Sequence, residues 1–290
     1  MTRSKKIRIP SLEAGRYADT FAVFVRHSLE YPQMLDELVR LACERLPEDF
    51  RLLDVGAGTG MVIRDWIRLS GVRPARYTAF EPNPSHLESL TGTLEAVGLA
   101  HEIEAAPFSN ATPLSGDYDM ALFSHSLYWM NDPAAALLHA ASALAPGGLA
   151  LAFIGGPYGL YGLFTLFEPY LERTTPMLQD NTMSSHELIQ GLRRYGLEPE
   201  VRFLPTPLDL SGLFERQSRS ELNEFLSFCL QLEFSHLPEW LQSDVIRQIQ
   251  GGCVPQDGCQ YWYQPTAVVV VNAADWAGRR SATPGSTAGA

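Results

Sequence analysis

The sequence has few of the features that mark disulfide-rich or zinc-binding proteins. Four of its 290 residues are cysteines, and no two of them form a CxxC pair. They are Cys43, Cys229, Cys253 and Cys259. This spacing argues against a disulfide framework and against a cysteine zinc site. We therefore expect free thiols, no bound metal and a cytoplasmic protein.

Long apolar runs and clustered positive charges are also missing. No stretch reaches the roughly 18 apolar residues that suggest a membrane-spanning helix, and the nearest candidate, residues 134–156, is broken by Pro146-Gly147-Gly148. The basic residues 1–8 lack the apolar region of a signal peptide. The net charge is −11, and binding phosphates requires clustered cations. We predict no membrane or nucleic-acid partner, and a monomer or homodimer.

Short β patterns instead alternate with helical patterns along the first half of the chain. The predicted strands are 51–55, 77–80, 103–106, 118–124 and 149–154, and the predicted helices between them are 61–70, 84–97 and 133–144. Such alternation is typical of a parallel sheet with helices on both faces. We predict one α/β domain with elaborations, built on a Rossmann-like, seven-stranded, mostly parallel sheet. Residues 266–271, TAVVVV, are its expected last strand.

Further helical patterns flank this core on both sides. Residues 11–48 predict a helical lid of two helices, and residues 49–156 are the expected cofactor-binding core. Within residues 157–275, the patterns predict helices at 160–172, 185–195, 220–232 and 238–249 and strands at 201–204 and 266–271. We expect these helices to form the substrate pocket. Residues 1–10 and 276–290 are expected to be disordered, the second because it is small, polar and rich in Gly and Pro.

The most informative motif, LLDVGAGTG at residues 52–60, joins the first strand to its helix. Gly56, Gly58 and Gly60 permit a tight turn and let a ligand approach the backbone. Their GxGxG spacing differs from the GxGxxG of NAD sites, which disfavours a NAD(P) enzyme. Glu81 ends the second strand, about twenty residues later, where an acid can accept hydrogen bonds from both ribose hydroxyls. Loop and acid together predict a nucleotide-type cofactor site.

These features resemble the class I S-adenosylmethionine-dependent methyltransferases over residues 48–156 and the final strand. The resemblance implies S-adenosyl-L-methionine as cofactor, with Glu81 on the ribose and the glycine loop at the amino-acid end. It also implies that the segment after the fourth strand faces cofactor and substrate. The cofactor-binding residues expected on this basis are Asp54, Gly56, Gly58, Gly60, Glu81, Pro82, His86, Phe108, Ser109 and Ser124.

A narrower resemblance begins near the N-terminus. Residues 15–30, GRYADTFAVFVRHSLE, are similar to the opening pattern of histamine N-methyltransferases, G-[KR]-Y-x3-F-x2-F-x2-H-S-x-E. A second pattern, D-x7-L-Y-[YW]-x2-D, is matched from Asp119 to Asp132. The resemblance implies a small methyl acceptor, such as an amine or nitrogen heterocycle. The implied pocket residues are Tyr17, Phe21, Glu30, Tyr128, Trp129, Leu160 and Phe164.

Three positions depart from that family. Leu160 and Phe164 stand where it has tryptophans, and Pro265 replaces an asparagine. A proline offers neither a side-chain amide nor an N–H. We therefore expect histamine to be a poor substrate and a different, bulkier small molecule to be the acceptor.

Two residues are candidates for catalysis. Glu30 is expected to bind the protonated amine and orient it, and His125, just after the fourth strand, is the candidate base that takes the proton. Spacing alone also allows Glu30 to be a solvated acid between two helices. His125 could equally be a hydrogen-bonded histidine that transfers no proton.

Two alternatives remain open at this point. The first is an O-methyltransferase acting on a small carboxylate or hydroxyl, which would also suit His125 and Trp129, although Glu30 would repel a carboxylate. The second is a non-catalytic cofactor-binding or interaction protein on the same fold. Loss of Glu81 or of the glycines would favour this second alternative, and the sequence retains both.

Overall fold

The computed structural model describes residues 6–114, 116–178 and 182–280, and the chain divides into two compact units. Unit 1 comprises the described parts of Met1–Gln33, Gly155–Ser184 and Phe203–Thr266. Unit 2 comprises those of Met34–Ile154, Ser185–Arg202 and Ala267–Ala290. Where we expected one domain with elaborations, the elaborations form a unit of their own. The predicted lid is divided as well, because the units separate after Gln33.

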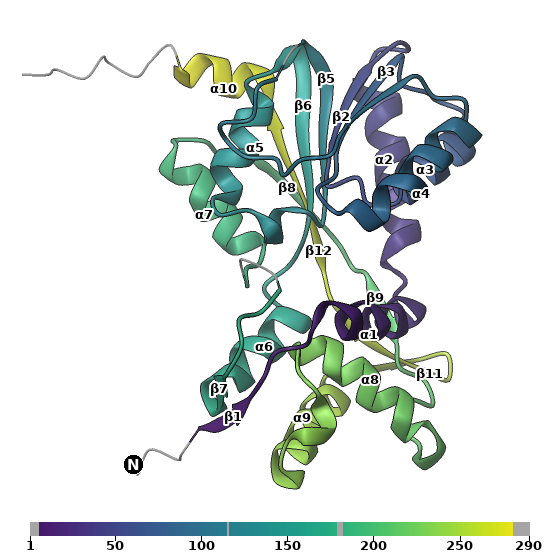
Figure 1. The fold of residues 1–290 in the computed structure, drawn as a ribbon, viewed down its shortest axis with the longest axis vertical. Helices are drawn as coiled ribbons and strands as arrows, with labels where there is room; N and C mark the ends of the chain where they lie inside the picture. Colours follow the sequence, from purple (N-terminus) through teal and green to yellow (C-terminus); the bar gives the residue numbers. More distant parts are fainter. Residues whose placement is uncertain (1–5, 115, 179–181, 281–290) are drawn as a thin grey trace, which may run out of the picture. The chain divides into compact units, whose positions relative to one another are not determined.

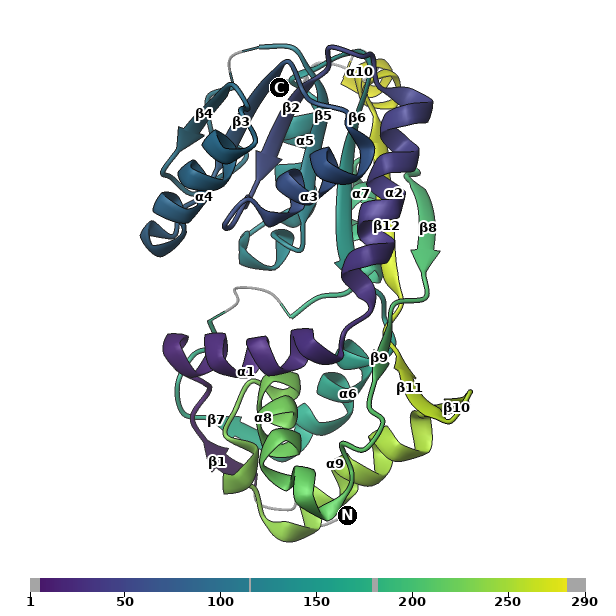
Figure 2. The ribbon, with the colours of Figure 1, turned by 90° about the vertical axis from the view of Figure 1, so that its right-hand side faces the viewer.

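Unit 2 is built on a seven-stranded sheet with the strand order β4-β3-β2-β5-β6-β12-β8 (Figures 1 and 2). The strands are β2 (Arg51–Val55), β3 (Arg76–Phe80), β4 (His101–Glu104), β5 (Tyr118–Ser124), β6 (Leu144–Gly155), β8 (Glu200–Leu204) and β12 (Thr266–Asn272). The pairs β2–β3, β2–β5, β3–β4 and β5–β6 are parallel. The predicted Rossmann-like, mostly parallel sheet is therefore confirmed, with β12 as its last strand.

Helices cover both faces of this sheet. They are α2 (Glu30–Arg45), α3 (Met61–Ser70), α4 (Pro84–Ala96), α5 (Pro133–Ala141), α7 (Ser185–Arg194) and α10 (Ala273–Arg280). Figures 1 and 2 show α2, α3 and α4 on one face, and α5 and α7 on the other. Both α4 and α5 have a proline in the first turn. The residue before each helix, Asn83 for α4 and Asp132 for α5, accepts a hydrogen bond from a backbone N–H of that helix through its side chain. This local chemistry stabilises the start of each helix.

Unit 1 is mainly helical. Its helices are α1 (Ala14–His27), α6 (Leu160–Phe167), α8 (Arg219–Leu230) and α9 (Glu239–Gly252). A two-stranded parallel sheet joins β1 (Ile7–Ile9) to β7 (Leu171–Arg173), and a three-stranded sheet joins β10 (Val254–Gln256), β11 (Cys259–Tyr263) and β9 (Pro207–Asp209). Its core includes Phe24, which lies 4.6 Å between ring centroids from Phe228. A separate core explains why these segments form a separate unit.

The structure differs from the predicted elements at several points. Residues 7–9 form β1 and bury Ile9 where we expected disorder, and residues 276–280 belong to α10. Helix α6 ends at Phe167, ahead of Pro169, which has no N–H to continue it. Strand β6 begins at Leu144, because a register shift opposite Tyr118 and Met120 accommodates the Pro-Gly-Gly segment. Residues 1–5 and 281–290 lie outside the described residues.

The described residues form neither a membrane-spanning helix nor a metal-binding cluster. None of the helices described combines the length and apolar character needed to cross a bilayer. Within the same residues, no group of three or more His, Cys, Asp or Glu side chains could hold a metal ion. All four cysteines are free thiols.

Candidate functional site

The strand order of unit 2 reverses between β2 and β5. These two strands are parallel neighbours, with Asp54 opposite Leu122, so the loops that follow them leave the same edge of the sheet. Open α/β sheets bind ligands in the crevice at such a switch point. The glycine loop follows β2, and the segment from His125 to Trp129 follows β5. The sequence therefore places its main motif at the position where the fold provides a ligand site.

The glycine loop has a backbone that other residues would adopt at a cost. Gly56, Gly58 and Gly60 have φ values of 78°, 57° and 76°. A Cβ atom on Gly56 would lie 2.4 Å from the Cβ of Ser126, in the loop after β5. The Gly56 N–H donates to the Phe80 carbonyl at 2.8 Å, which ties the loop to the end of β3. Glycine is thus required here by conformation and by space.

Glu81 stands at the centre of the hydrogen bonds around this loop. Its side chain is 5% exposed. One carboxylate oxygen accepts the Gly58 N–H at 2.7 Å, and the other accepts the Asn83 N–H at 2.8 Å. His86 Nδ1 lies 3.5 Å from the carboxylate. Each oxygen of a carboxylate can accept two hydrogen bonds, so Glu81 is fixed in place and retains acceptor capacity for ligand hydroxyls.

A second buried acid, Asp54, lies at the end of β2. It is 2% exposed and accepts a hydrogen bond from the Tyr77 hydroxyl at 2.7 Å. Burial raises the pKa of Asp54 to about 6, because it penalises the charged form; the Glu81 charge adds to this effect and the Tyr77 hydrogen bond opposes it. Burial likewise holds the pKa of Tyr77 well above its usual range. The Tyr77–Asp54 hydrogen bond joins the neighbouring strands β2 and β3.

The residues expected near an adenine ring have different surroundings. Phe108 is buried, with its ring edge-on to Phe80 at 5.2 Å and to Phe123 at 5.9 Å. Ser109 is exposed, and its N–H donates to the Thr112 hydroxyl at 2.8 Å. Pro82 is exposed beside Glu81, and Ser124 is half-buried at the end of β5. Phe108 thus belongs to an aromatic cluster of the core.

The segment after β5 carries a strained histidine. His125 has a φ of 53°, which is unusual for a residue with a side chain. Its N–H donates to the Phe153 carbonyl at 3.1 Å, and its ring is stacked with Tyr128 at a centroid distance of 6.1 Å. The Tyr128 hydroxyl lies 3.5 Å from His125 Nδ1. Trp129 is 46% exposed. Strain of this kind is concentrated at functional sites.

The acceptor residues expected from the first helix lie in unit 1. Tyr17 and Phe21 share a face of α1, and their stacked rings are 6.3 Å apart. Both contact the ring of Phe228 on α8, at 5.5 Å and 5.3 Å. Phe21 remains 45% exposed. The two residues thus cover the core of unit 1 and also present an aromatic surface.

Glu30 is the first residue of α2, whose first turn belongs to unit 1, and it is half-buried. Its N–H donates to the Ser28 hydroxyl at 3.2 Å, and its carboxylate accepts a hydrogen bond from the buried Thr266 hydroxyl. The interpretation of Glu30 as a fully solvated acid does not fit this environment. The structure shows a carboxylate held in one orientation.

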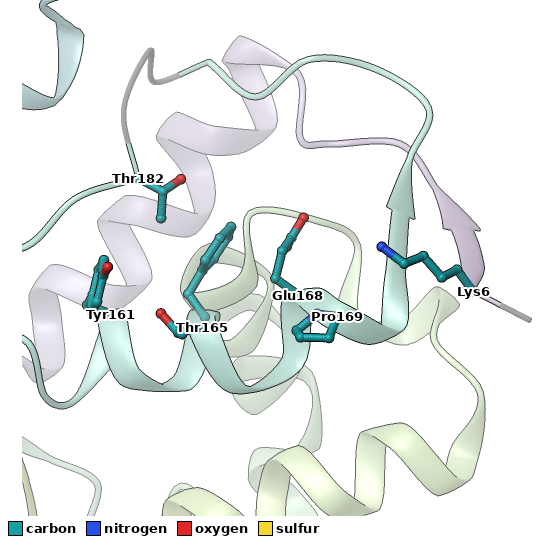
Figure 3. Close-up of a pocket in the computed structure, with 7 residues that line it drawn as sticks. Lys6, Tyr161, Thr165, Glu168, Pro169 and Thr182 are labelled. Carbon is teal, nitrogen blue, oxygen red and sulfur yellow. The ribbon is translucent and has the colours of Figure 1, made fainter. Parts of the chain in front are cut away.

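Leu160 and Phe164 lie one turn apart on α6. Phe164 lines a pocket of about 360 Å³ in unit 1 together with Tyr161, Thr165 and Glu168 (Figure 3). The Arg173 guanidinium lies 5.1 Å from the Phe164 ring centroid and pairs with Glu168 at 2.9 Å. Leu160 packs against the core and does not line this pocket.

The structure adds two residues that sequence reasoning did not select. Ser126 touches the glycine loop, and only its position after β5 could have signalled this. Thr266 contacts Glu30 across 236 residues of sequence, and no local pattern carries that information.

Comparisons with known proteins agree with this geometry. A family model described as a methyltransferase domain matches residues 25–200, more than half of the chain. No curated protein matches the sequence. A proposed methyltransferase from Bacillus halodurans C-125 is similar in structure, with a TM-score of 0.52 and 14% identity over 82% of this chain and 98% of that one.

A second similar structure comes from the complex between the Haloferax volcanii Trm112 methyltransferase activator and a proposed methyltransferase. Its TM-score is 0.50, with 14% identity over 88% of this chain and 94% of that one. At these identities the similarity shows the fold alone. The family match carries the assignment, and the cofactor of such enzymes is the predicted S-adenosylmethionine. The chain belongs to the methyltransferase-domain family.

Proposed function

We propose that the enzyme transfers a methyl group from S-adenosylmethionine to the nitrogen of a small amine or nitrogen heterocycle. The observation that carries the proposal is the Glu30 carboxylate, which the Thr266 hydroxyl holds in one orientation. A fixed, half-buried carboxylate favours a positively charged partner and disfavours an anion. Aromatic faces, which Tyr17 and Phe21 supply on the same unit, also attract cations.

The proposal assigns cofactor binding to unit 2. The sulfonium of S-adenosylmethionine supplies the methyl group. Glu81 would accept hydrogen bonds from the ribose hydroxyls, since its two oxygens each already hold one backbone N–H and can accept more. The positive φ values of Gly56, Gly58 and Gly60 expose the backbone for close contact with the amino-acid end. Phe108, Ser109 and Ser124 are proposed at the adenine side, with Asp54, Pro82 and His86 supporting the loop and Glu81.

A protonated amine must lose one proton before its nitrogen can attack the methyl group. Glu30 would bind the protonated amine and orient it, and orientation of this kind supplies much of the catalysis in a displacement reaction. His125 is the proposed base, with Tyr128 within 3.5 Å of its Nδ1. Tyr128, Trp129, Leu160 and Phe164 complete the proposed set of acceptor residues.

A panel of acceptors tests the proposal. Purified enzyme with labelled S-adenosylmethionine is offered amines, imidazoles, indoles and small carboxylates, and the panel is repeated with Glu30→Gln. We expect turnover of cationic amines, with histamine among the poorer ones, and its loss in Glu30→Gln. Preferred methylation of carboxylates that Glu30→Gln leaves unchanged would replace the proposal by O-methylation. Binding of S-adenosylhomocysteine without any turnover would favour the non-catalytic alternative.

A further inference from the structure

The environment of Glu30 extends beyond its direct contact with Thr266. Thr266 is 1% exposed, and its hydroxyl lies 3.3 Å from that of Thr206, which is 2% exposed. The Thr206 hydroxyl donates to the Gln264 carbonyl. A threonine hydroxyl has one hydrogen to donate. Thr206 uses its hydrogen on Gln264, so it does not donate to Thr266. An ionised carboxylate can only accept, so the Thr266 hydroxyl is the donor in its contact with Glu30.

Thr206 is itself held in an unusual conformation. Its φ is 35°, an outlier for a β-branched residue. Two backbone hydrogen bonds fix it there: its N–H donates to the Gln33 side chain at 3.2 Å, and its carbonyl accepts the Gln264 N–H at 3.2 Å. A strained residue held by several surrounding groups is characteristic of functional regions.

Glu30 and Gln33 lie three residues apart on α2 and so share one face of the helix. Through Thr266 and Thr206, both are bound to the same two segments of chain, around residues 206 and 264–266. The backbone before α2 is also fixed, because the Leu29 N–H donates to the Pro207 carbonyl at 3.0 Å. The backbone and the carboxylate of Glu30 are thus restrained independently.

We infer that Thr266, which lies beside the fixed Thr206, is a positioning residue that orients the Glu30 carboxylate for recognition of a cationic amine. The inference rests on the proposed function. A glutamate loses considerable side-chain freedom when it is immobilised. In this enzyme the Thr266 hydrogen bond immobilises Glu30 before the amine binds, and a hydrogen bond from a neutral hydroxyl leaves the negative charge available to the substrate.

The test compares Thr266→Val, which removes the hydroxyl at nearly constant volume, with Thr266→Ser, which keeps it. The probes are tryptamine, its neutral analogue tryptophol and its anionic analogue indole-3-acetate. Binding is measured by calorimetry with S-adenosylhomocysteine present, and turnover of tryptamine with labelled S-adenosylmethionine. Thr20→Val is the control, since Thr20 is a buried threonine of the same unit whose hydroxyl donates to the Arg16 and Tyr17 carbonyls of α1.

In Thr266→Val we expect the preference for tryptamine over tryptophol to fall by roughly tenfold, as loss of a hydrogen bond to a charged group predicts. Thr266→Ser and Thr20→Val should keep the preference, and all variants should bind S-adenosylhomocysteine as the wild type does. An unchanged preference in Thr266→Val would overturn the positioning role alone. If the wild-type enzyme itself does not prefer tryptamine, the amine assignment fails, and the inference fails with it.

Discussion

Gly56 and Ser126 approach so closely that a single methyl group on the glycine would lie 2.4 Å from the Ser126 Cβ. The contact joins the loop after β2 to the loop after β5, the two neighbouring strands between which the order of the sheet reverses. The two loops therefore lie too close together here for any side chain at position 56. The geometry of the proposed cofactor site therefore depends on this contact as well as on the glycine backbone.

Replacing Gly56 by alanine should combine a clash with backbone strain. We expect Gly56→Ala to lower the free energy of unfolding by roughly 2–4 kcal/mol, the sum of overpacking and a positive φ at a non-glycine residue. Gly58→Ala is the matched control, because Gly58 has a φ of 57° but nothing lies within 4 Å of its added Cβ. Gly58→Ala should lower the free energy of unfolding by roughly 1–2 kcal/mol, because only the backbone strain remains. Urea unfolding of both variants separates the effect of the Ser126 clash from that of the backbone strain. If the two variants lost the same free energy of unfolding, the Ser126 contact would not be important for stability.

Glu81 should control cofactor affinity. Glu81→Ala removes the acceptor of the Gly58 and Asn83 N–H groups and the proposed acceptor of the ribose hydroxyls. We expect S-adenosylhomocysteine binding to weaken by roughly 1.5–3 kcal/mol, the range for hydrogen bonds to charged groups. Calorimetry gives the value, and the exposed Glu88→Ala on α4 serves as control. Unaltered affinity in Glu81→Ala would exclude the ribose role.

Asp54 should make the stability of the enzyme depend on pH. Its pKa in the folded protein is about 6, above the ordinary 3.8, so the fold favours the neutral acid. The stability gained in this way is fully present below pH 3.8 and is lost as the pH rises through about 6. At about 1.4 kcal/mol per pKa unit, the loss amounts to roughly 3 kcal/mol.

Asp54→Asn tests this dependence, because asparagine still accepts the Tyr77 hydrogen bond but does not ionise. Denaturant unfolding is measured from pH 4 to pH 8 for wild type, for Asp54→Asn and for Asp36→Asn, an exposed control on α2. As the pH rises, we expect the free energy of unfolding of Asp54→Asn to increase relative to that of the wild type. Parallel curves for the wild type and Asp54→Asn would show that Asp54 does not titrate in this range.

Most of the sheet could be predicted because its signals are local. The glycine loop at residues 56–60 marks the end of one strand, and alternation of strands and helices implies the parallel order. The segment TAVVVV could be identified as a strand from its composition, but its place between β6 and β8 depends on contacts with residues far away in the sequence. The short strand β1 was missed for the same reason, since Ile7 and Ile9 pair with residues more than 160 positions later.

The candidate site was predictable to a similar extent. Glu81 and the glycines form a motif, so their proximity could be expected and the structure shows it. The hairpin of β10 and β11 could have been predicted from Asp257-Gly258, whose φ values of 52° and 83° suit a tight turn. The Thr266–Glu30 hydrogen bond could not have been predicted. A threonine that begins a strand has the same local pattern whether or not a carboxylate lies beside it.

The position of β12 has a consequence for synthesis of the protein. This strand comes after residue 265 in the chain but lies between β6 and β8 inside the sheet. While residues 205–265 are being synthesised, β6 and β8 lack the strand that separates them and expose unpaired backbone edges. Exposed edges of this kind promote association with other chains. The sheet can therefore be completed only after β12 has been synthesised, and the exposed edges of β6 and β8 make the nascent chain prone to aggregation until then.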